Sequence, residues 1–216
     1  MIFTCIGHAK FLIELEGGMR IVTDPYDATC GYPVEPMMAD TVLVSHGHHD
    51  HNAVDTISGY TQVIDAPGEY TLAPDVKVTA VSACHDDQGG AQRGKNLLFL
   101  IEAEGLRAAH LGDLGHVLTA EQAKALAPVD VVMIPVGGHF TIDATTACEV
   151  AGQLRARVVL PMHYKTKVNA GWPIKGVEEF LAAYGRPSEE LDLLRVAKGD
   201  LECQPEVAVL RAVSLK

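Results

Sequence analysis

The segment Ser45–His51, with the sequence SHGHHDH, is the feature that most constrains how this chain can fold. It places four histidines and one aspartate within six residues, directly after the apolar and β-branched run Thr41–Ser45 (TVLVS). Several imidazole rings are costly to bury together unless a metal ion or another group organises them. The segment is internal and is interrupted by Gly47 and Asp50, which argues against an expression tag. We therefore expect a metal-binding loop at the end of a buried strand.

The spacing within this segment favours two metal sites over one. His46 and His48 are two residues apart, so in an extended turn their side chains point the same way. Asp50 and His51 are adjacent and aim more naturally at a different point. Imidazole and carboxylate ligands together suit zinc, iron or manganese.

Further ligands for two metals are predicted at the ends of other strands. His85, Asp113 (in HLGDLGH) and His163 (in LPMHYK) each follow an apolar run that is typical of a β-strand. A rigid sheet positions side chains at strand ends while leaving them at the mouth of a site. We expect these three residues to meet the histidine-rich segment.

Composition and charge exclude several classes of protein. The chain has 216 residues, of which 48% are hydrophobic, which is enough for a sizeable core and excludes a mainly disordered chain. Its 17 Lys and Arg against 28 Asp and Glu give a net charge of −11 with neutral histidine. This acidic balance, without a basic tract, argues against a generic binder of nucleic acid or of anionic membranes.

Cysteine usage and the N-terminal sequence favour a cytoplasmic protein. The five cysteines are widely spaced and form no C-x-x-C pair, so we expect reduced thiols and neither a disulfide framework nor a cysteine zinc site. The first residues show no basic region followed by a long apolar run and a cleavage site. No stretch reaches the roughly 18 apolar residues of a membrane span.

Hydrophobic patterning predicts one domain over residues 1–216, with sheets inside and helices outside. Helices are expected after the capping box that begins at Thr119, after the N-cap Asp143, and over Val177–Tyr184. The predicted strands are Ile2–Ile6, Phe11–Glu16, Met19–Thr23, Thr41–Ser45, Gln62–Asp65, Val76–Ser82, Leu97–Glu102, Leu106–Leu111, Val129–Val136, Arg157–Leu160 and Glu206–Val213.

Four separated motifs together resemble the metallo-β-lactamase-fold hydrolases. They are His-x-His-x-Asp-His (46–51), a lone histidine after a strand (85), Gly-Asp (112–113) and Pro-x-His (161–163), in matching order over nearly the whole chain. Within that superfamily the chain looks most like small stand-alone hydrolases related to ascorbate-6-phosphate lactonase, through IGHAKFLIE, TDP, HDDQGGAQRGKN, GDLGH, PVGGHFTID and PMHYKT. The resemblance implies an α/β fold, a four-layer αβ/βα sandwich of two mixed sheets flanked by helices, with the site at one edge between the sheets.

The resemblance also implies roles for individual residues. The first metal would be held by His46, His48 and His85, the second by Asp50, His51 and His163, with Asp113 bridging both. Two divalent ions roughly 3.5–4 Å apart can share a water and lower its pKa toward about 7, which makes a bridging hydroxide the expected nucleophile. Asp50 would also orient this hydroxide. Zinc is the first expectation, with manganese and iron open.

Residues around these motifs are candidates for supporting roles. His116, three residues after Asp113, is the candidate general acid for the leaving group. His8 and Asp24 are expected to support the metal ligands through hydrogen bonds. Candidates for contacts with an anionic substrate are Arg93, Asn96 and Lys165. Asn96 either donates to the substrate or fixes its own loop.

The leading hypothesis is a dinuclear metal hydrolase acting on a small, anionic ester, lactone or amide. A phosphodiesterase acting on a nucleotide or a phospholipid-like substrate would use the same metals, so the ligands leave this alternative open. A di-iron redox protein is disfavoured because no flavin-binding segment is visible and flavodiiron relatives carry glutamate where His48 stands. The complete ligand set disfavours a non-catalytic scaffold. The expected partner is a small-molecule substrate, and homo-oligomerisation is left open.

Overall fold

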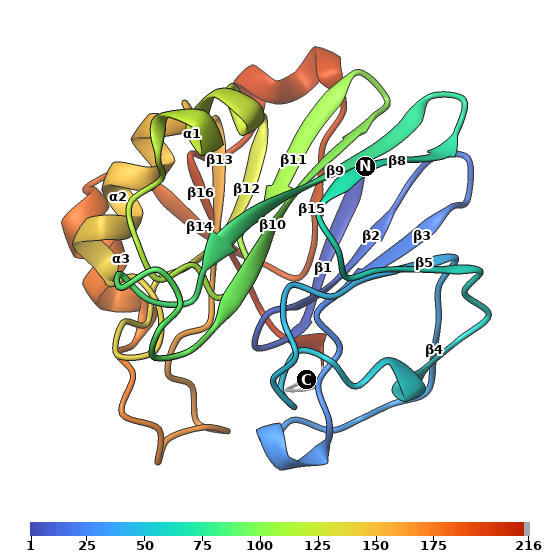
Figure 1. Ribbon diagram of the computed structural model, residues 1–216. Coiled ribbons are helices and arrows are strands. Elements are labelled where there is room, and N and C mark those ends of the chain that lie inside the picture. The colour runs from blue at the N-terminus through green and yellow to red at the C-terminus, as the bar shows by residue number, and fades with distance from the viewer. Residues whose placement is uncertain (214–216) are drawn as a thin grey trace.

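Two β-sheets packed face to face form the centre of the computed structural model, which describes residues 1–213 (Figure 1). The smaller sheet contains, in spatial order, β15 (Leu194–Arg195), β1 (Ile2–Gly7), β2 (Lys10–Glu14), β3 (Arg20–Thr23), β5 (Thr41–Leu43) and β7 (Gln62–Ile64). The larger sheet contains β14 (Ser188–Leu191), β16 (Val207–Leu210), β13 (Val158–Met162), β12 (Val131–Pro135), β11 (Leu106–His110), β10 (Lys95–Ala103), β9 (Val76–Cys84) and β8 (Gly68–Ala73).

Both sheets are mixed, as predicted. In the smaller sheet β1, β2 and β3 pair antiparallel, whereas β3, β5 and β7 pair parallel. In the larger sheet the strands from β8 to β11 pair antiparallel, and β11, β12 and β13 pair parallel. Parallel strands of one sheet have their carboxyl ends at the same edge, so the loops after β11 and β13 leave one edge of the larger sheet and the loops after β3 and β5 leave one edge of the smaller sheet.

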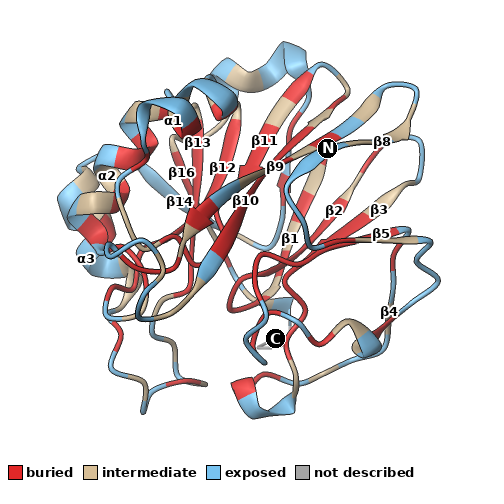
Figure 2. Ribbon diagram, in the orientation of Figure 1, coloured by how far each residue is buried: buried red, intermediate tan, exposed pale blue. Residues whose placement is uncertain are grey.

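The layer between the sheets is apolar because the strands present alternate side chains to it. On β10, Leu97, Phe99 and Ile101 belong to the cluster between the sheets. Leu98 and Leu100 on the same strand point to the opposite face, where the helices pack. This explains why the central strands read as continuous apolar runs: both of their faces are buried (Figure 2).

Three α-helices cover the outer face of the larger sheet (Figure 1). α1 (Ala120–Leu126) begins at the capping box of Thr119, and α2 (Ala144–Gln153) begins at its N-cap Asp143, as predicted. α3 (Val177–Tyr184) packs against α2. Short 3-10 helices are η1 (Ala28–Cys30), η2 (Val54–Thr56) and η3 (Lys198–Cys203). Within residues 1–213, no helix has the length and apolar character needed to span a membrane.

The outer face of the smaller sheet has a different cover. Ile57 and Ala39 pack there against Val22 and Val42 of the sheet. They belong to a segment that contains η2 and a two-stranded sheet of β4 (Met37–Met38) and β6 (Ile57–Ser58). The predicted α/β sandwich is therefore confirmed, but within residues 1–213 its layer over the smaller sheet is built from short strands and a 3-10 turn, in place of an α-helix.

Removing a large side chain from the layer between the sheets is expected to destabilise the protein strongly. Phe99 is fully buried there, so Phe99→Ala should lower the free energy of unfolding by about 3–5 kcal/mol, because its contacts are lost and a cavity remains. Urea denaturation followed by circular dichroism measures this change. Val117→Ala, at a position that is 36% exposed, is the control and should change the free energy of unfolding by less than about 0.5 kcal/mol. A Phe99→Ala protein as stable as the control would contradict this packing.

Candidate metal centre

The loops at one edge of the sandwich bring all seven predicted metal ligands together. These residues follow strands β5, β9, β11 and β13, and their donor atoms form three overlapping groups. The residues are His46, His48, Asp50, His51, His85, Asp113 and His163. Six of them are buried, and His48 is the member of the cluster that is exposed to solvent.

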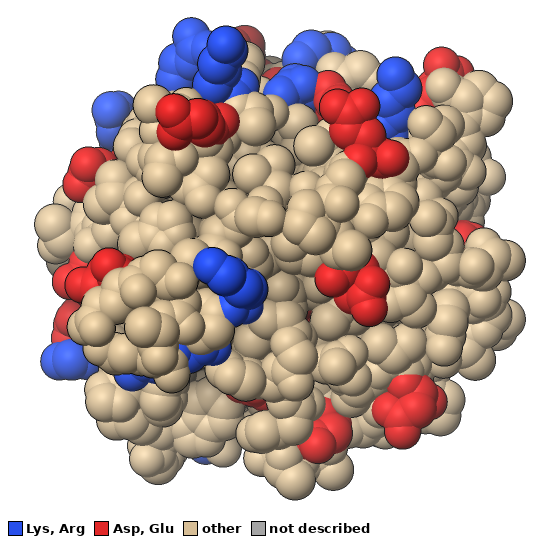
Figure 3. Space-filling model, viewed as in Figure 1, with Lys and Arg blue, Asp and Glu red and all other residues tan. Residues whose placement is uncertain are grey.

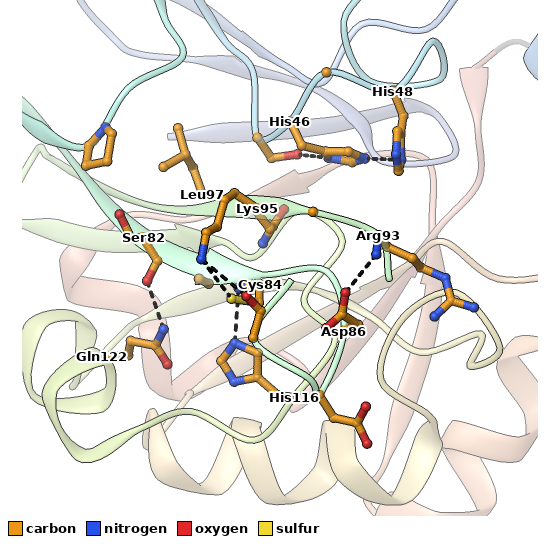
Figure 4. A pocket seen from close by; sticks show the side chains of 18 of the residues that line it. His46, His48, Ser82, Cys84, Asp86, Arg93, Lys95, Leu97, His116 and Gln122 are labelled. Atoms are coloured by element: carbon orange, nitrogen blue, oxygen red, sulfur yellow. Dashed lines mark hydrogen bonds between the residues drawn. The ribbon is translucent and has the colours of Figure 1, made fainter. Parts of the chain in front are cut away.

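The first group contains His46, His48 and His85, whose candidate ligand atoms lie within 4.8 Å of one another. Nε2 of His46 lies 3.0 Å from Nδ1 of His48, and Figure 4 shows the two rings side by side. Two ligands that each stand 2.0–2.1 Å from one tetrahedral zinc ion are separated by about 3.3–3.4 Å. The spacing of these atoms is therefore close to that of neighbouring ligands on one ion.

The second group contains Asp50, His51 and His163, and the structure adds His8 to it. Nε2 of His51 lies 3.7 Å from Oδ2 of Asp50, and Nε2 of His8 lies 3.4 Å from the same oxygen. These four side chains come from three separate loops of the chain.

Asp113 connects the two groups. Its Oδ2 lies 3.0 Å from Nε2 of His85, which belongs to the first group, and 3.2 Å from Nε2 of His163, which belongs to the second. Its Oδ1 lies 3.3 Å from Nε2 of His51. The carboxylate is thus in contact with histidines of both groups.

Asp24 orients the histidine-rich segment through hydrogen bonds. Its fully buried carboxylate accepts hydrogen bonds from the backbone N–H and the hydroxyl of Ser45, both at 2.7 Å. It also lies 2.8 Å from Nδ1 of His51, which leaves Nε2 of that ring directed at Asp113. The Ser45 hydroxyl reaches Nδ1 of His46 at 2.9 Å. Asp24 therefore fixes the orientation of one histidine directly and of another through Ser45.

Burial and mutual charge set the protonation of the metal-free cluster. Burial lowers the pKa of His8 to about 4 and that of His46 to about 3, so both rings are neutral at pH 7. Burial also opposes a charge on His51, but the carboxylates of Asp113 and Asp24 outweigh it and hold the pKa of this ring well above its ordinary value. For Asp113, burial is outweighed by the neighbouring histidines, which hold its pKa well below the ordinary range.

The geometry does not support His116 as a general acid. Its Nε2 accepts a hydrogen bond from the backbone N–H of Cys84 at 3.1 Å, and its Nδ1 lies 2.8 Å from the carbonyl oxygen of Val117. Both ring nitrogens are thus engaged by the backbone, as Figure 4 shows for the contact with Cys84. In the structure His116 joins the loop after Asp113 to strand β9, and its role as a general acid stays a prediction.

The structure places the three residues predicted to contact a substrate in three different environments. Arg93 lines a cavity of about 470 Å³ together with Asp113 and other members of the cluster. Asn96 is buried on β10, donates to the carbonyl oxygen of Leu111 at 2.9 Å and accepts from the N–H of Asp113 at 3.0 Å, so it fixes the turn before Asp113 and not its own loop, and it is not free to contact a substrate. Lys165 is exposed and is not among the residues that line the described cavities next to the cluster, which argues against its predicted role.

A carboxylate holds the loop that carries Arg93. Asp86 accepts hydrogen bonds from the backbone N–H groups of Gln88, Gly90, Gln92 and Arg93 at 2.7–3.0 Å (Figure 4). The guanidinium of Arg93 lies 5.8 Å from the ring centre of Phe140. Among residues 1–213, no carboxylate lies within ion-pair distance of this guanidinium, so its charge is available to a ligand.

Sequence reasoning missed the aromatic wall of this cavity at Phe140. Phe140 and Trp172 meet edge to face with ring centres 6.2 Å apart, and both line the cavity that contains Asp50 and Asp113. Phe140 lies in the loop after β12, the strand between β11 and β13, whose loops carry predicted ligands. The place of this loop, between two loops that carry predicted ligands, is the signal that could have indicated Phe140 as a residue of the site.

A second cavity, of about 1080 Å³, opens on the other side of His46 and His48 (Figure 4). It is also lined by Arg93, Lys95 and Gln122. Figure 3 shows a face on which charged side chains are scattered over a largely uncharged surface, without a basic patch across its centre.

Known proteins resemble this chain over most of its length. Residues 3–163 match the Beta-lactamase superfamily domain. Proteins named metal-dependent hydrolase from Thermococcus onnurineus and Anaeromyxobacter sp. are 31% and 33% identical to it, over 87% and 90% of this chain and 94% and 84% of their own. The finer likeness to ascorbate-6-phosphate lactonase stays a prediction.

Solved structures agree with the sequence relatives. A Thermotoga maritima protein, described as a candidate Zn-dependent hydrolase of the metallo-beta-lactamase superfamily, shares 37% identity and a TM-score of 0.76, with 97% of each chain covered. Igni18, a metallo hydrolase from Ignicoccus hospitalis, shares the fold with 23% identity and a TM-score of 0.68, over 98% of this chain and 95% of its own.

The metal-free protein is expected to lose stability as the pH falls from 6.5 toward 4. Burial lowers the pKa of His8 and His46, and also that of His48 and His110, so these rings stay neutral when folded. Unfolded histidines take up protons below about pH 6.5, so the unfolded state binds more protons in this range and the free energy of unfolding decreases. The raised pKa of His51 acts in the opposite sense, but it is one ring against four. Urea midpoints of chelator-treated protein at pH 7.0, 5.5 and 4.5 measure the change, and a midpoint that rises on acidification would contradict it.

Proposed function

Because the chain belongs to the metallo-β-lactamase superfamily, whose relatives are metal-dependent hydrolases, we propose that it binds two divalent metal ions and hydrolyses a small anionic ester, lactone or amide. One observation carries this proposal: seven predicted ligands meet in two groups that share Asp113. The first ion would be held by His46, His48, His85 and Asp113, and the second by Asp50, His51, His163 and Asp113.

The residues of the cluster fit a metal. Nε2 of His51 and Oδ1 of Asp113 are buried and face each other at 3.3 Å, and neither atom has a partner in good hydrogen-bond geometry. Polar atoms buried without a partner are costly, and a bound cation would satisfy both of them. The donors are imidazole nitrogens and carboxylate oxygens, which suit zinc, manganese or iron. We take zinc as the first candidate.

Bound divalent ions would lower the pKa of water toward about 7 and would polarise a substrate oxygen. Around them, the chain supplies orientation and charge. Asp50 lines the cavity, and although its burial raises its pKa, the nearby His8 and His51 outweigh this and keep the pKa below its ordinary value. Its carboxylate is therefore ionised at neutral pH and can orient an attacking water or accept its proton.

The cavity beside Asp50 indicates the kind of substrate. Its 470 Å³ suits a small molecule, and its wall of Phe140 and Trp172 suits an apolar portion of that molecule. Arg93 faces the same cavity with no carboxylate partner among residues 1–213, so it can pair with a carboxylate or phosphate of the substrate.

Metal analysis tests the first part of the proposal. We expect the purified protein, reconstituted with zinc and dialysed, to contain close to two ions per chain by elemental analysis. Asp113→Ala should lose at least one ion and hydrolytic activity should fall by at least a hundredfold, because this carboxylate touches both groups. The control Asp55→Ala removes a carboxylate outside the cluster and should keep both ions. A wild-type protein that binds no metal after reconstitution would contradict the proposal.

A substrate panel tests the second part. Anionic lactones, carboxylic esters and amides should be hydrolysed in preference to bis-p-nitrophenyl phosphate, and the reverse preference would favour a phosphodiesterase.

Arg93 should set the preference for an anion. We expect Arg93→Gln to raise KM for an anionic ester by about 10–100-fold and to leave KM for a neutral ester nearly unchanged, because it removes a charge-assisted hydrogen bond. Lys165→Gln is the matched control, since this cation lines neither cavity beside the cluster, and it should leave both values unchanged. Equal effects of Arg93→Gln on the two esters would refute a role in anion recognition.

A further inference from the structure

His8 stands with the proposed ligands of the second metal ion, although its sequence context indicated only a supporting hydrogen bond. Its candidate ligand atom lies within 4.8 Å of those of Asp50, His51 and His163. The nearest carboxylate oxygen, Oδ2 of Asp50, lies 3.4 Å from Nε2 of His8. This exceeds the 2.7–2.9 Å that is usual for a charge-assisted hydrogen bond.

Both ring nitrogens of His8 are buried and neither has a partner in good hydrogen-bond geometry, since Nε2 faces only Oδ2 of Asp50 at the long distance of 3.4 Å. Nε2 shares this property with Nε2 of His51 and Oδ1 of Asp113, two atoms that we propose as metal donors. The residue as a whole is only 5% exposed. Leaving an imidazole nitrogen buried and unpaired is unfavourable unless another group completes its environment.

The separation of the donors matches one shared ion. Adjacent ligands that each stand 2.0–2.1 Å from one five-coordinate ion, at angles of about 90–120°, lie about 2.9–3.6 Å apart. The distance from His8 to Asp50 is 3.4 Å, whereas that from His51 to the same oxygen of Asp50 is 3.7 Å. By this measure His8 fits the shell of Asp50 at least as well as His51 does.

The backbone is built to hold His8 in this place. The residue lies in the turn between β1 and β2 with a φ of 54°, a left-handed conformation that is uncommon for a residue other than glycine. Its carbonyl oxygen accepts the backbone N–H of His163 at 3.3 Å, and the two rings lie 4.2 Å apart between centres. Trp172 closes the other side, with a ring-centre distance of 5.2 Å.

We propose that His8 is itself a ligand of the second metal ion, which then has three imidazoles and Asp50 in addition to the shared Asp113. The inference rests on the proposed two-metal function. With five donors from the chain around the second ion and four around the first, fewer positions are left for water on the second ion.

Metal affinity and cobalt spectra test this assignment without an activity assay. His8→Asn removes the imidazole, and asparagine tolerates the left-handed backbone. The matched control is His139→Asn, since His139 has a φ of 60° and is exposed. Chelator competition gives the dissociation constant of each bound zinc ion, and the visible absorption of the cobalt-substituted protein reports the ligands around each ion.

We expect His8→Asn to weaken one of the two zinc sites by more than about a hundredfold and to change the cobalt spectrum. Loss of a group that only orients a ligand costs about 10–100-fold in metal affinity. His139→Asn should match the wild type in both measurements. His8→Ala should reproduce the effect, because it also removes the amide oxygen with which asparagine could replace the ring.

A loss of less than a hundredfold with an unchanged cobalt spectrum in both variants would overturn the assignment and make His8 a residue that positions Asp50. Unfolding midpoints of the metal-free variants equal to that of the wild type show that the folded chain is being compared. A wild type that holds two ions but hydrolyses nothing in the panel would refute the proposed reaction and leave the ligand assignment standing.

Discussion

The apolar layer between the two sheets fixes the relative positions of the loops that carry the candidate metal ligands. Phe99 and its neighbours on β10 fix the larger sheet against the smaller one, and so fix the distance between the loops that leave both sheets. Asp113 leaves the larger sheet and the histidine-rich segment leaves the smaller one. The contact between Asp113 and His51 therefore depends on packing far from the cluster, because neither sheet alone carries all of the donors.

The buried carboxylate of Asp24 connects the smaller sheet to the cluster. Asp24 follows β3 and binds both Ser45 and His51, which follow β5. It thereby selects which nitrogen of His51 faces Asp113. Burying the charge of Asp24 is unfavourable in free energy, and the hydrogen bonds and imidazole rings around the carboxylate offset this penalty.

Much of the fold and of the ligand set was predictable because both leave chemical traces in the sequence. Central strands such as β10 and β12 are apolar on both faces, and histidines clustered at the end of a strand are typical of a metal site. The edge strand β14 was missed because its sequence, SEEL, has no apolar alternation and it is a strand only through pairing with β16. The strand predicted at Glu206–Val213 is found at Val207–Leu210, between β14 and β13.

The roles of Asn96 and His116 were harder to predict, since they depend on partners that belong to the backbone. The amide of asparagine and a neutral imidazole can each donate to a carbonyl oxygen and accept from an N–H, so the sequence does not indicate which backbone group they meet. Asn96 binds the turn of Asp113, and His116 binds Cys84 and Val117. The residue types in a sequence indicate which side chains are candidate metal donors. The hydrogen-bond partners that orient these side chains are seen only in the folded structure.

The loop that Asp86 organises has a consequence for the thermodynamics of recognition. A flexible loop that must become ordered around an anion loses conformational entropy on binding, and this loss weakens affinity. Here the carboxylate has already fixed the backbone from Gln88 to Arg93. The backbone of the loop is therefore ordered during folding, so in the proposed function an anionic substrate would bind without paying for this ordering. Asp86 would then contribute to the affinity for a molecule that it does not touch.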